Sequence, residues 1–169
     1  MRFVTGWSTP DKRILVNFDD KVLDVFREHI QRVGSDAEAG GLLLGEVRGR
    51  HLNLVDATFP TVGDLRSRYS FERLPQGHAE VAQKMWSDSR GTVRYLGEWH
   101  SHPQDLPIPS GIDRSEWKRL ASERKDKRPF LAVIVGREGL HVELVPMKGS
   151  GIVLSPCARG LQRALHDRL

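Results

Sequence analysis

The histidine pair His100 and His102 is the feature of this sequence that most clearly suggests chemistry. Both residues stand at the end of the run YLGEWHSH, which is apolar at first and then turns polar. Side chains on a strand alternate between its two faces, so the two imidazoles point to one side and Ser101 points to the other. Two imidazoles on one face can bind one metal ion. A catalytic zinc ion takes three protein ligands and leaves its fourth position to water, so one more ligand is required.

Asp113 is the best candidate for this third ligand. It follows the loop PQDLPIP, whose prolines stiffen the chain and can return the next helix to the end of the strand. A structural interpretation is also open, because Ser110 and Asp113 fit the start of a helix, with Ser110 as the N-cap and Asp113 in the first turn. We predict one zinc ion per chain, bound by His100, His102 and Asp113.

Hydrolysis at a zinc ion also needs a group that moves protons, and two glutamates could serve. Glu98 lies on the same strand and the same face as the histidines, so spacing alone favours Glu98. Glu38 lies far away in SDAEAGGLLLG, where Ser35 and Glu38 match the S-x-x-E helix cap. However, Gly40 and Gly41 follow at once and no strong helix begins there. The glycine pair instead indicates that the backbone closely approaches another part of the molecule.

A mixture of strands and helices is predicted to position these residues. Apolar runs predict strands over residues 13–18, 40–49, 51–59, 68–71, 93–102, 129–136 and 140–146. Helical periodicity predicts helices over residues 19–34, 75–91 and 110–127 and a short basic helix in the tail, 156–169. In the second helix the apolar pattern runs through Val81, Met85 and Trp86. Strands and helices mix without strict alternation, so we expect an α/β or α+β fold built on a mixed sheet.

The length of 169 residues and a composition of 38% hydrophobic and 28% charged residues predict one globular domain over residues 1–169. The single cysteine, Cys157, cannot form an internal disulfide and is expected to be buried, which favours a reducing compartment. No signal peptide and no apolar run of about 20 residues is present, so we expect a cytoplasmic protein that does not enter membranes. The remaining histidines show no ligand spacing: His29, His51, His78, His141 and His166.

The net charge of +4 is mild, and the densest basic run, ERKDKR, contains acidic residues as well. This run is typical of a solvated helix end. Nucleic-acid binding would need a basic stripe with interleaved aromatic residues, which the sequence lacks. We therefore expect no nucleic-acid partner.

Two blocks of the sequence resemble the JAMM (MPN-plus) zinc metallopeptidases. HSHPQDLPIPSGID fits the pattern H-x-H-x(7)-S-x(2)-D at every position, and EAGGLLLG is similar to the family's upstream block, an acid before a glycine-rich strand. The blocks come in the family's order, after an N-terminal amphipathic helix. The resemblance implies an α-β-α arrangement around a curved mixed sheet over nearly the whole chain.

The resemblance also implies a role for each of five residues. His100, His102 and Asp113 would hold the zinc ion, with water in the fourth place. Glu38 would be the general base that activates this water and passes its proton to the leaving amine. Ser110 would donate a hydrogen bond to the tetrahedral oxyanion.

The family pattern thus selects Glu38 over Glu98 as the base, against the argument from spacing. Glu98 is then expected to lie around the site or at the surface. Since all five residues are present, we expect an active enzyme rather than an MPN scaffold that only binds a partner.

The compact length and the form GEWHSHP look more like the prokaryotic JAB branch, and overall similarity favours the peptidases of CBASS antiphage operons. Those peptidases work beside E1- and E2-like enzymes and remove a cGAS-like nucleotidyltransferase from its conjugation targets. The resemblance implies cleavage after the C-terminal tail of such a protein, with the tail adding a strand to an exposed sheet edge. The alternative substrates are a bacterial ubiquitin-like modifier and a sulfur-carrier protein.

Overall fold

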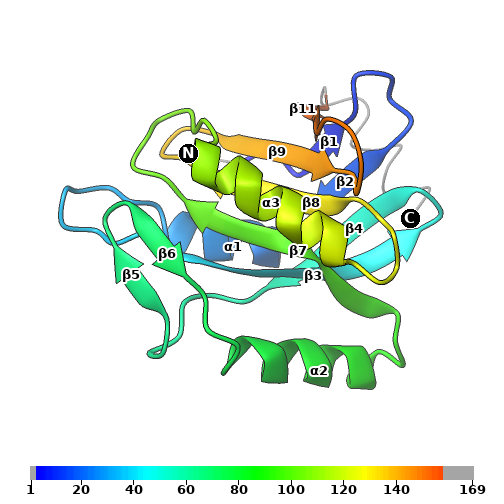
Figure 1. Ribbon diagram of the computed structural model, residues 1–169, viewed down its shortest axis with the longest axis horizontal. Helices are drawn as coiled ribbons and strands as arrows, with labels where there is room; N and C mark the ends of the chain where they lie inside the picture. Colours follow the sequence, from blue (N-terminus) through cyan, green and yellow to red (C-terminus); the bar gives the residue numbers. More distant parts are fainter. Residues whose placement is uncertain (1–2, 158–169) are drawn as a thin grey trace.

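A curved, mixed sheet forms the centre of the protein in the computed structural model, which describes residues 3–157 (Figure 1). Its strands are β1 Gly6–Ser8, β2 Leu15–Phe18, β3 Gly40–Arg48, β4 His51–Ala57, β7 Val93–Ser101, β8 Phe130–Val135, β9 Leu140–Val145, β10 Ile152–Val153 and β11 Ser155–Pro156. Their order in the sheet is β10-β9-β8-β7-β3-β4-β2-β1-β11. Neighbouring strands are antiparallel except for the parallel pairs β7 with β8 and β2 with β4. A separate hairpin consists of β5 Leu65–Ser67 and β6 Ser70–Glu72.

The last two strands show that the sheet nearly closes on itself. Strand β10 pairs with β9 at one end of the sheet, and β11 pairs with β1 at the other end. Only the buried Leu154 separates β10 from β11 in the sequence, so the two ends must lie next to each other. This closure gives the sheet an inner and an outer face.

Helices cover both faces of the sheet: α1 Asp20–Glu28, α2 His78–Asp88 and α3 Gly111–Glu123. Helix α1 contacts β2 and β4, helix α3 contacts β8 and β9, and helix α2 contacts β3 and β7. Figure 1 shows α1 behind the sheet and α3 in front of it. The α-β-α arrangement around a curved mixed sheet that the family resemblance predicted is therefore confirmed.

Successive side chains of β7 point alternately into the hydrophobic core and toward the face that carries the histidine pair. Trp99 is 1% exposed and joins the inner core with Phe18 and Phe26. On the opposite face, Trp117 of α3 packs on β8, and the ring centroids of His100 and Trp117 lie 6.4 Å apart. The histidine pair thus lies on the outer face, below the start of α3, as the alternation predicted.

Helix α1 ends at Glu28 and not at the predicted Gly34. The carboxylate of Asp36 accepts hydrogen bonds from the backbone N–H groups of Arg32 and Val33, at 2.8 and 3.0 Å, and these bonds hold a turn. Short polar side chains that bond the backbone in this way compete with the helix.

Helix α2 buries less apolar surface than its sequence pattern predicted. Val81 and Trp86 are 43% and 51% exposed, whereas Met85, together with Ala82, packs in the cluster that contains Leu42 and Leu44. The helix lies at the lower edge of the view in Figure 1, below β3 and β7. An apolar pattern alone does not reveal how much of a helix its neighbours cover.

The short strands β1, β5, β10 and β11 were not predicted, because two or three residues carry no readable period. The predicted C-terminal helix lies almost entirely outside the described residues, and a single domain over residues 1–169 stays a prediction. Among the helices within residues 3–157, none combines the length and the apolar character needed to cross a membrane.

Candidate metal centre and active site

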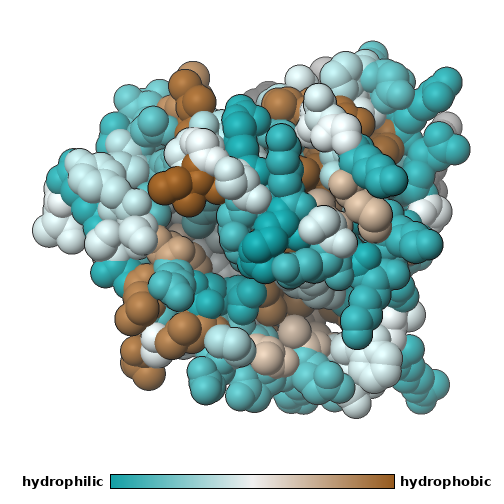
Figure 2. Space-filling model, viewed as in Figure 1, coloured by the Kyte–Doolittle hydropathy of each residue, from teal (hydrophilic) through white to brown (hydrophobic). Residues whose placement is uncertain are grey.

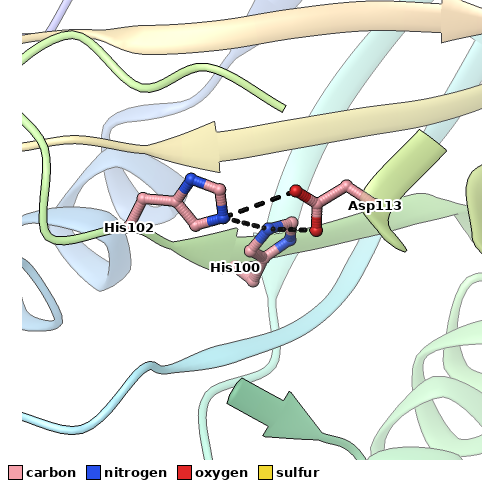
Figure 3. A group of neighbouring side chains, drawn as sticks. All are labelled: His100, His102 and Asp113. Atoms are coloured by element: carbon pink, nitrogen blue, oxygen red, sulfur yellow. Dashed lines mark hydrogen bonds and ion pairs between the residues drawn. The ribbon is translucent and has the colours of Figure 1, made fainter. Parts of the chain in front are cut away.

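His100, His102 and Asp113 converge at the end of β7 and the start of α3 (Figure 3). The Nε2 atoms of the two histidines lie 3.1 Å apart. Oδ1 of Asp113 lies 3.1 Å from Nε2 of His100, and Oδ2 lies 3.5 Å from Nε2 of His102. Residues that the sequence separates by a proline-rich loop thus form one cluster.

The geometry and chemistry of this cluster fit one zinc ion. A tetrahedral ion with metal–ligand bonds of about 2.0–2.2 Å has ligand–ligand separations of about 3.3–3.6 Å. The two Nε2 atoms lie 3.1 Å apart, and each lies 3.1 or 3.5 Å from its nearer oxygen of the Asp113 carboxylate, so the three side chains are close to this spacing. Two imidazoles and one carboxylate also leave one tetrahedral position for a further ligand, as in catalytic zinc sites.

The protonation states of the cluster suit metal binding. Burial and the neighbouring His100 lower the pKa of His102, so its imidazole is neutral at pH 7 and can offer a lone pair. Burial alone would raise the pKa of Asp113. Hydrogen bonds from His100 and Ser110 outweigh burial and hold this pKa well below its usual range. The aspartate is therefore a carboxylate at neutral pH.

Ser110 and Asp113 also cap helix α3, so the structural interpretation is confirmed, and it is compatible with the predicted metal binding. The backbone N–H of Asp113 donates to Oγ of Ser110 at 3.1 Å, and the backbone N–H of Ser110 donates to Oδ2 of Asp113 at 2.6 Å. These two bonds fix the carboxylate against the first turn of the helix. The cap thereby orients Asp113 toward the histidines.

Glu38 lies beside the cluster, just before β3. Its neighbour Gly40 pairs with His100 across the β3–β7 ladder. Glu38 is 6% exposed, and burial raises the pKa of its carboxyl to about 7, with the nearby His100 lowering it and Asp113 raising it. Long-range strand pairing thus brings Glu38 to the histidines, as the family resemblance predicted and spacing could not.

Glu98 lines the same groove, but its carboxylate is engaged elsewhere. Oε1 of Glu98 accepts hydrogen bonds from the Arg73 guanidinium at 2.8 Å and from the Tyr95 hydroxyl at 3.2 Å. These partners fix the carboxylate to the wall of the groove. The location agrees with the expectation that Glu98 lies around the site, and the choice of Glu38 as the base stays a prediction.

A groove of about 1110 Å³ opens over the cluster. The β5–β6 hairpin forms one wall, the start of α3 and the loop before it form the other, and Glu38, Glu98 and the metal-binding cluster also line it. Figure 2 shows that most of this face is hydrophilic, with apolar side chains gathered on the left, where the hairpin and this loop lie. Exposed apolar residues of the loop and of α3 are Leu106, Ile108 and Ile112.

The groove depends on two features that the sequence did not identify. The hairpin is one, and it fits closely because a Cβ atom at Gly40 would lie 2.5 Å from the ring of Phe71. The predicted close approach at this glycine is confirmed. The other is a buried network at the base of the hairpin, in which His78 contacts Thr58 at 2.6 Å and Asp64 at 2.9 Å. The sequence did not predict a role for His78, because its two partners are distant in the sequence.

Comparison with known proteins agrees with this geometry. The sequence pattern of the prokaryotic homologues of the JAB domain matches residues 19–146. The chain belongs to this family. The prediction of the prokaryotic JAB branch is therefore confirmed.

Two relatives of this JAB protein have the same name. The chain is 55% identical over 156 residues to a CD-NTase/cGAS isopeptidase of Pseudomonas aeruginosa, covering 92% of this chain and 99% of the relative. It is 35% identical over 135 residues to a CD-NTase/cGAS isopeptidase of Escherichia coli, covering 75% of this chain and 83% of the relative.

The fold of this JAB protein is also found in a solved structure. A protein of Desulfitobacterium hafniense, whose structure was solved in solution, superposes with a TM-score of 0.59 at 21% identity, covering 83% of this chain and 89% of that protein. At this identity the similarity concerns the fold alone.

Proposed function

We propose that the protein is a zinc-dependent isopeptidase that releases a cGAS-like nucleotidyltransferase (CD-NTase) from its conjugates by cleaving after the C-terminal tail. The observation that carries this proposal is the convergence of His100, His102 and Asp113 at metal-binding distances beside the buried Glu38. The relatives named CD-NTase/cGAS isopeptidase support the substrate class. E1- and E2-like enzymes in the same pathway and a cytoplasmic location stay predictions.

The residues of the groove divide the chemistry between them. When bound by His100, His102 and Asp113, zinc would polarise the scissile carbonyl and lower the pKa of the attacking water. Glu38 is a buried carboxyl beside this cluster, and a carboxyl can accept a proton and release it again, so Glu38 suits general acid–base work. Glu38 would take a proton from the attacking water and give it to the amine, while the carbonyl carbon gains oxygen and loses the C–N bond.

Ser110 is placed to support charge that develops at the reacting carbonyl. Its Oγ accepts the Asp113 N–H, so the cap uses a lone pair and leaves the hydroxyl hydrogen out of the bond. Ser110 is exposed and lines the groove. We propose that this hydroxyl donates to the oxyanion, where one well-placed donor accelerates acyl transfer by about 10²–10³-fold.

The groove suits an extended peptide. Within residues 3–157, β6 pairs only with β5, and its residues Ser70, Phe71 and Glu72 line the groove. A substrate tail that adds a strand here would satisfy backbone groups of β6 and pass between the hairpin and α3. This position would bring the bond after the tail to the metal-binding cluster.

The test uses a CD-NTase whose C-terminus is fused to a reporter protein. Purified wild-type protein should contain about one zinc ion per chain and cleave this fusion. Glu38→Gln should keep the metal and lose cleavage, whereas Glu28→Gln, an exposed glutamate at the end of α1, should behave as wild type. Zinc-loaded wild-type protein that cleaves no tailed substrate would instead identify a binding scaffold. Cleavage of a ubiquitin-like or sulfur-carrier fusion in place of the CD-NTase fusion would reject the proposed substrate.

A further inference from the structure

The β5–β6 hairpin is bonded directly to the peptide group of Glu38. The backbone N–H of Glu38 donates to the carbonyl of Ser67 at 2.7 Å. Nε of Arg66 donates to the carbonyl of Glu38 at 2.6 Å, and another guanidinium nitrogen donates to the carbonyl of Ala37 at 3.2 Å. Both backbone groups of the predicted base are therefore held by two consecutive residues of the hairpin.

The opposite side of this segment is bonded to β7. The backbone N–H of Ser101 donates to the carbonyl of Ala39 at 2.7 Å, and the N–H of Ala39 donates to Oγ of Ser101 at 3.0 Å. Ser101 lies between the two predicted metal ligands, His100 and His102. Glu38 is thus connected to the metal-binding cluster on one side and to the hairpin on the other.

Arg66 bonds the Glu38 segment through its side chain. Its guanidinium is a rigid planar fork, and its two bonds hold the carbonyls of Ala37 and Glu38, which belong to the peptide groups on either side of the Glu38 Cα. Together these bonds restrict the φ and ψ angles of Glu38, and a change in those angles would redirect its side chain.

The hairpin itself borders the place where substrate would lie. Its strand β6 lines the groove, while all three residues of β5 are exposed. A chain that pairs with β6 would therefore contact the hairpin whose other strand, β5, bonds the Glu38 segment. We infer that Arg66 is a positioning residue that holds the Glu38 carboxylate toward the metal-binding cluster through the hairpin. This inference rests on the proposed function.

The first experiment compares Arg66→Ala and Arg66→Lys with Arg94→Ala. Arg94 is a matched control, because it is an exposed arginine that also donates to a backbone carbonyl, that of Gly91, at 3.0 Å. With the CD-NTase fusion as the substrate, Arg66→Ala should lower kcat by roughly ten- to hundred-fold with KM and zinc content unchanged. Arg66→Lys, which keeps one donor, should recover part of this loss, and Arg94→Ala should match wild type. A raised KM with unchanged kcat would overturn the inference, since Arg66 would then bind substrate instead.

Amide hydrogen exchange gives a second readout that does not depend on activity. Arg66→Ala should speed exchange at the Glu38 amide and leave the amides of β8 unchanged, whereas Arg94→Ala should change neither. Unchanged exchange at Glu38 would overturn the inference even if activity falls. If the wild type cleaves no fusion, the proposed function fails, and the exchange result still decides whether Arg66 holds the Glu38 peptide.

Discussion

Ser110 and Asp113 bond each other reciprocally, and the carboxylate that closes this helix cap also faces both histidines. The two cap bonds measure 3.1 and 2.6 Å, and Oδ1 of the same carboxylate lies 3.1 Å from Nε2 of His100. A capping box holds its side chains without help from the rest of the fold. The cap therefore orients Asp113, the predicted metal ligand, through bonds within four residues of the chain.

Replacement of Ser110 should distinguish its role as a helix cap from its proposed role as a donor to the oxyanion. Ser110→Ala removes the cap acceptor and should lower the free energy of unfolding by about 1 kcal/mol. If the hydroxyl also supports the oxyanion, the same change should lower kcat by roughly 10²-fold. Ser110→Thr keeps an oxygen in place and should restore most of both properties. Denaturant unfolding and steady-state kinetics of the two variants measure this. Equal kcat for Ser110→Ala and wild type would show that the serine hydroxyl takes no part in catalysis.

The raised pKa of Glu38 predicts a stability change with pH in metal-free protein. Burial raises this pKa from 4.5 to about 7, so between these values the folded state holds a proton that the unfolded state has lost. The contribution of Glu38 to folding stability should therefore be highest below pH 4.5 and should fall as the pH rises to 7 and slightly above. The loss is up to about 3 kcal/mol.

The measurement is urea unfolding at several pH values in the presence of a chelator. Glu38→Gln removes the titrating group, so its stability should not show this fall, and it should exceed the wild type most at pH 8. Glu28→Gln, at an exposed site, is the control and should follow the wild type. Parallel curves for Glu38→Gln and wild type would show that the carboxyl titrates normally.

The buried contact between His78 and Asp64 should contribute strongly to stability. Both side chains are fully buried, and burial would raise the pKa of Asp64, but hydrogen bonds from His78 and from two backbone N–H groups outweigh it and lower this pKa. His78→Ala would leave the carboxylate short of a partner, at a cost of about 2–4 kcal/mol. A double-mutant cycle with Asp64→Asn should show a coupling of about 1 kcal/mol or more. Additive effects in the cycle would mean that the contact makes no net contribution to the free energy of unfolding.

Zinc removal should destabilise the wild type and leave a ligand variant unaffected. An ion that binds only the folded state stabilises it by RT ln(1 + [L]/Kd), which is about 4 kcal/mol at a thousandfold excess over Kd. A chelator should therefore lower the melting temperature of the wild type. His100→Ala, which removes one ligand, should melt at the same temperature with and without the chelator. A zinc-dependent shift that persists in His100→Ala would place the ion elsewhere.

The sequence identified those parts of the site that local rules control. Alternation along one strand placed His100 and His102 on the same face, and a cap motif placed Asp113 at the start of the next helix. Glu38 could not be found in this way, because the pairing of Gly40 with His100 joins distant segments. Spacing alone favoured Glu98, whose carboxylate in fact contacts Arg73. Only the family pattern selected Glu38.

The fold shows the same division between local and long-range control. The class and most of the long strands followed from apolar runs. The end of α1 did not, because Asp36 turns the chain from a position after the predicted helix. The exposure of Trp86 on α2 depends on which neighbours cover the helix, and the apolar periodicity of the sequence does not predict those neighbours. Of the hairpin beside Glu38, the sequence predicted only a strand over residues 68–71, which overlaps β6, and the three residues of β5 left no pattern.

The most direct test of the central claim is anomalous diffraction at the zinc absorption edge from crystals of zinc-loaded protein. The account predicts one strong peak at about 2.0–2.2 Å from Nε2 of His100, Nε2 of His102 and one carboxylate oxygen of Asp113. A peak that lies away from this cluster, or a loaded crystal in which the two imidazoles turn from each other and hold no ion, would contradict it.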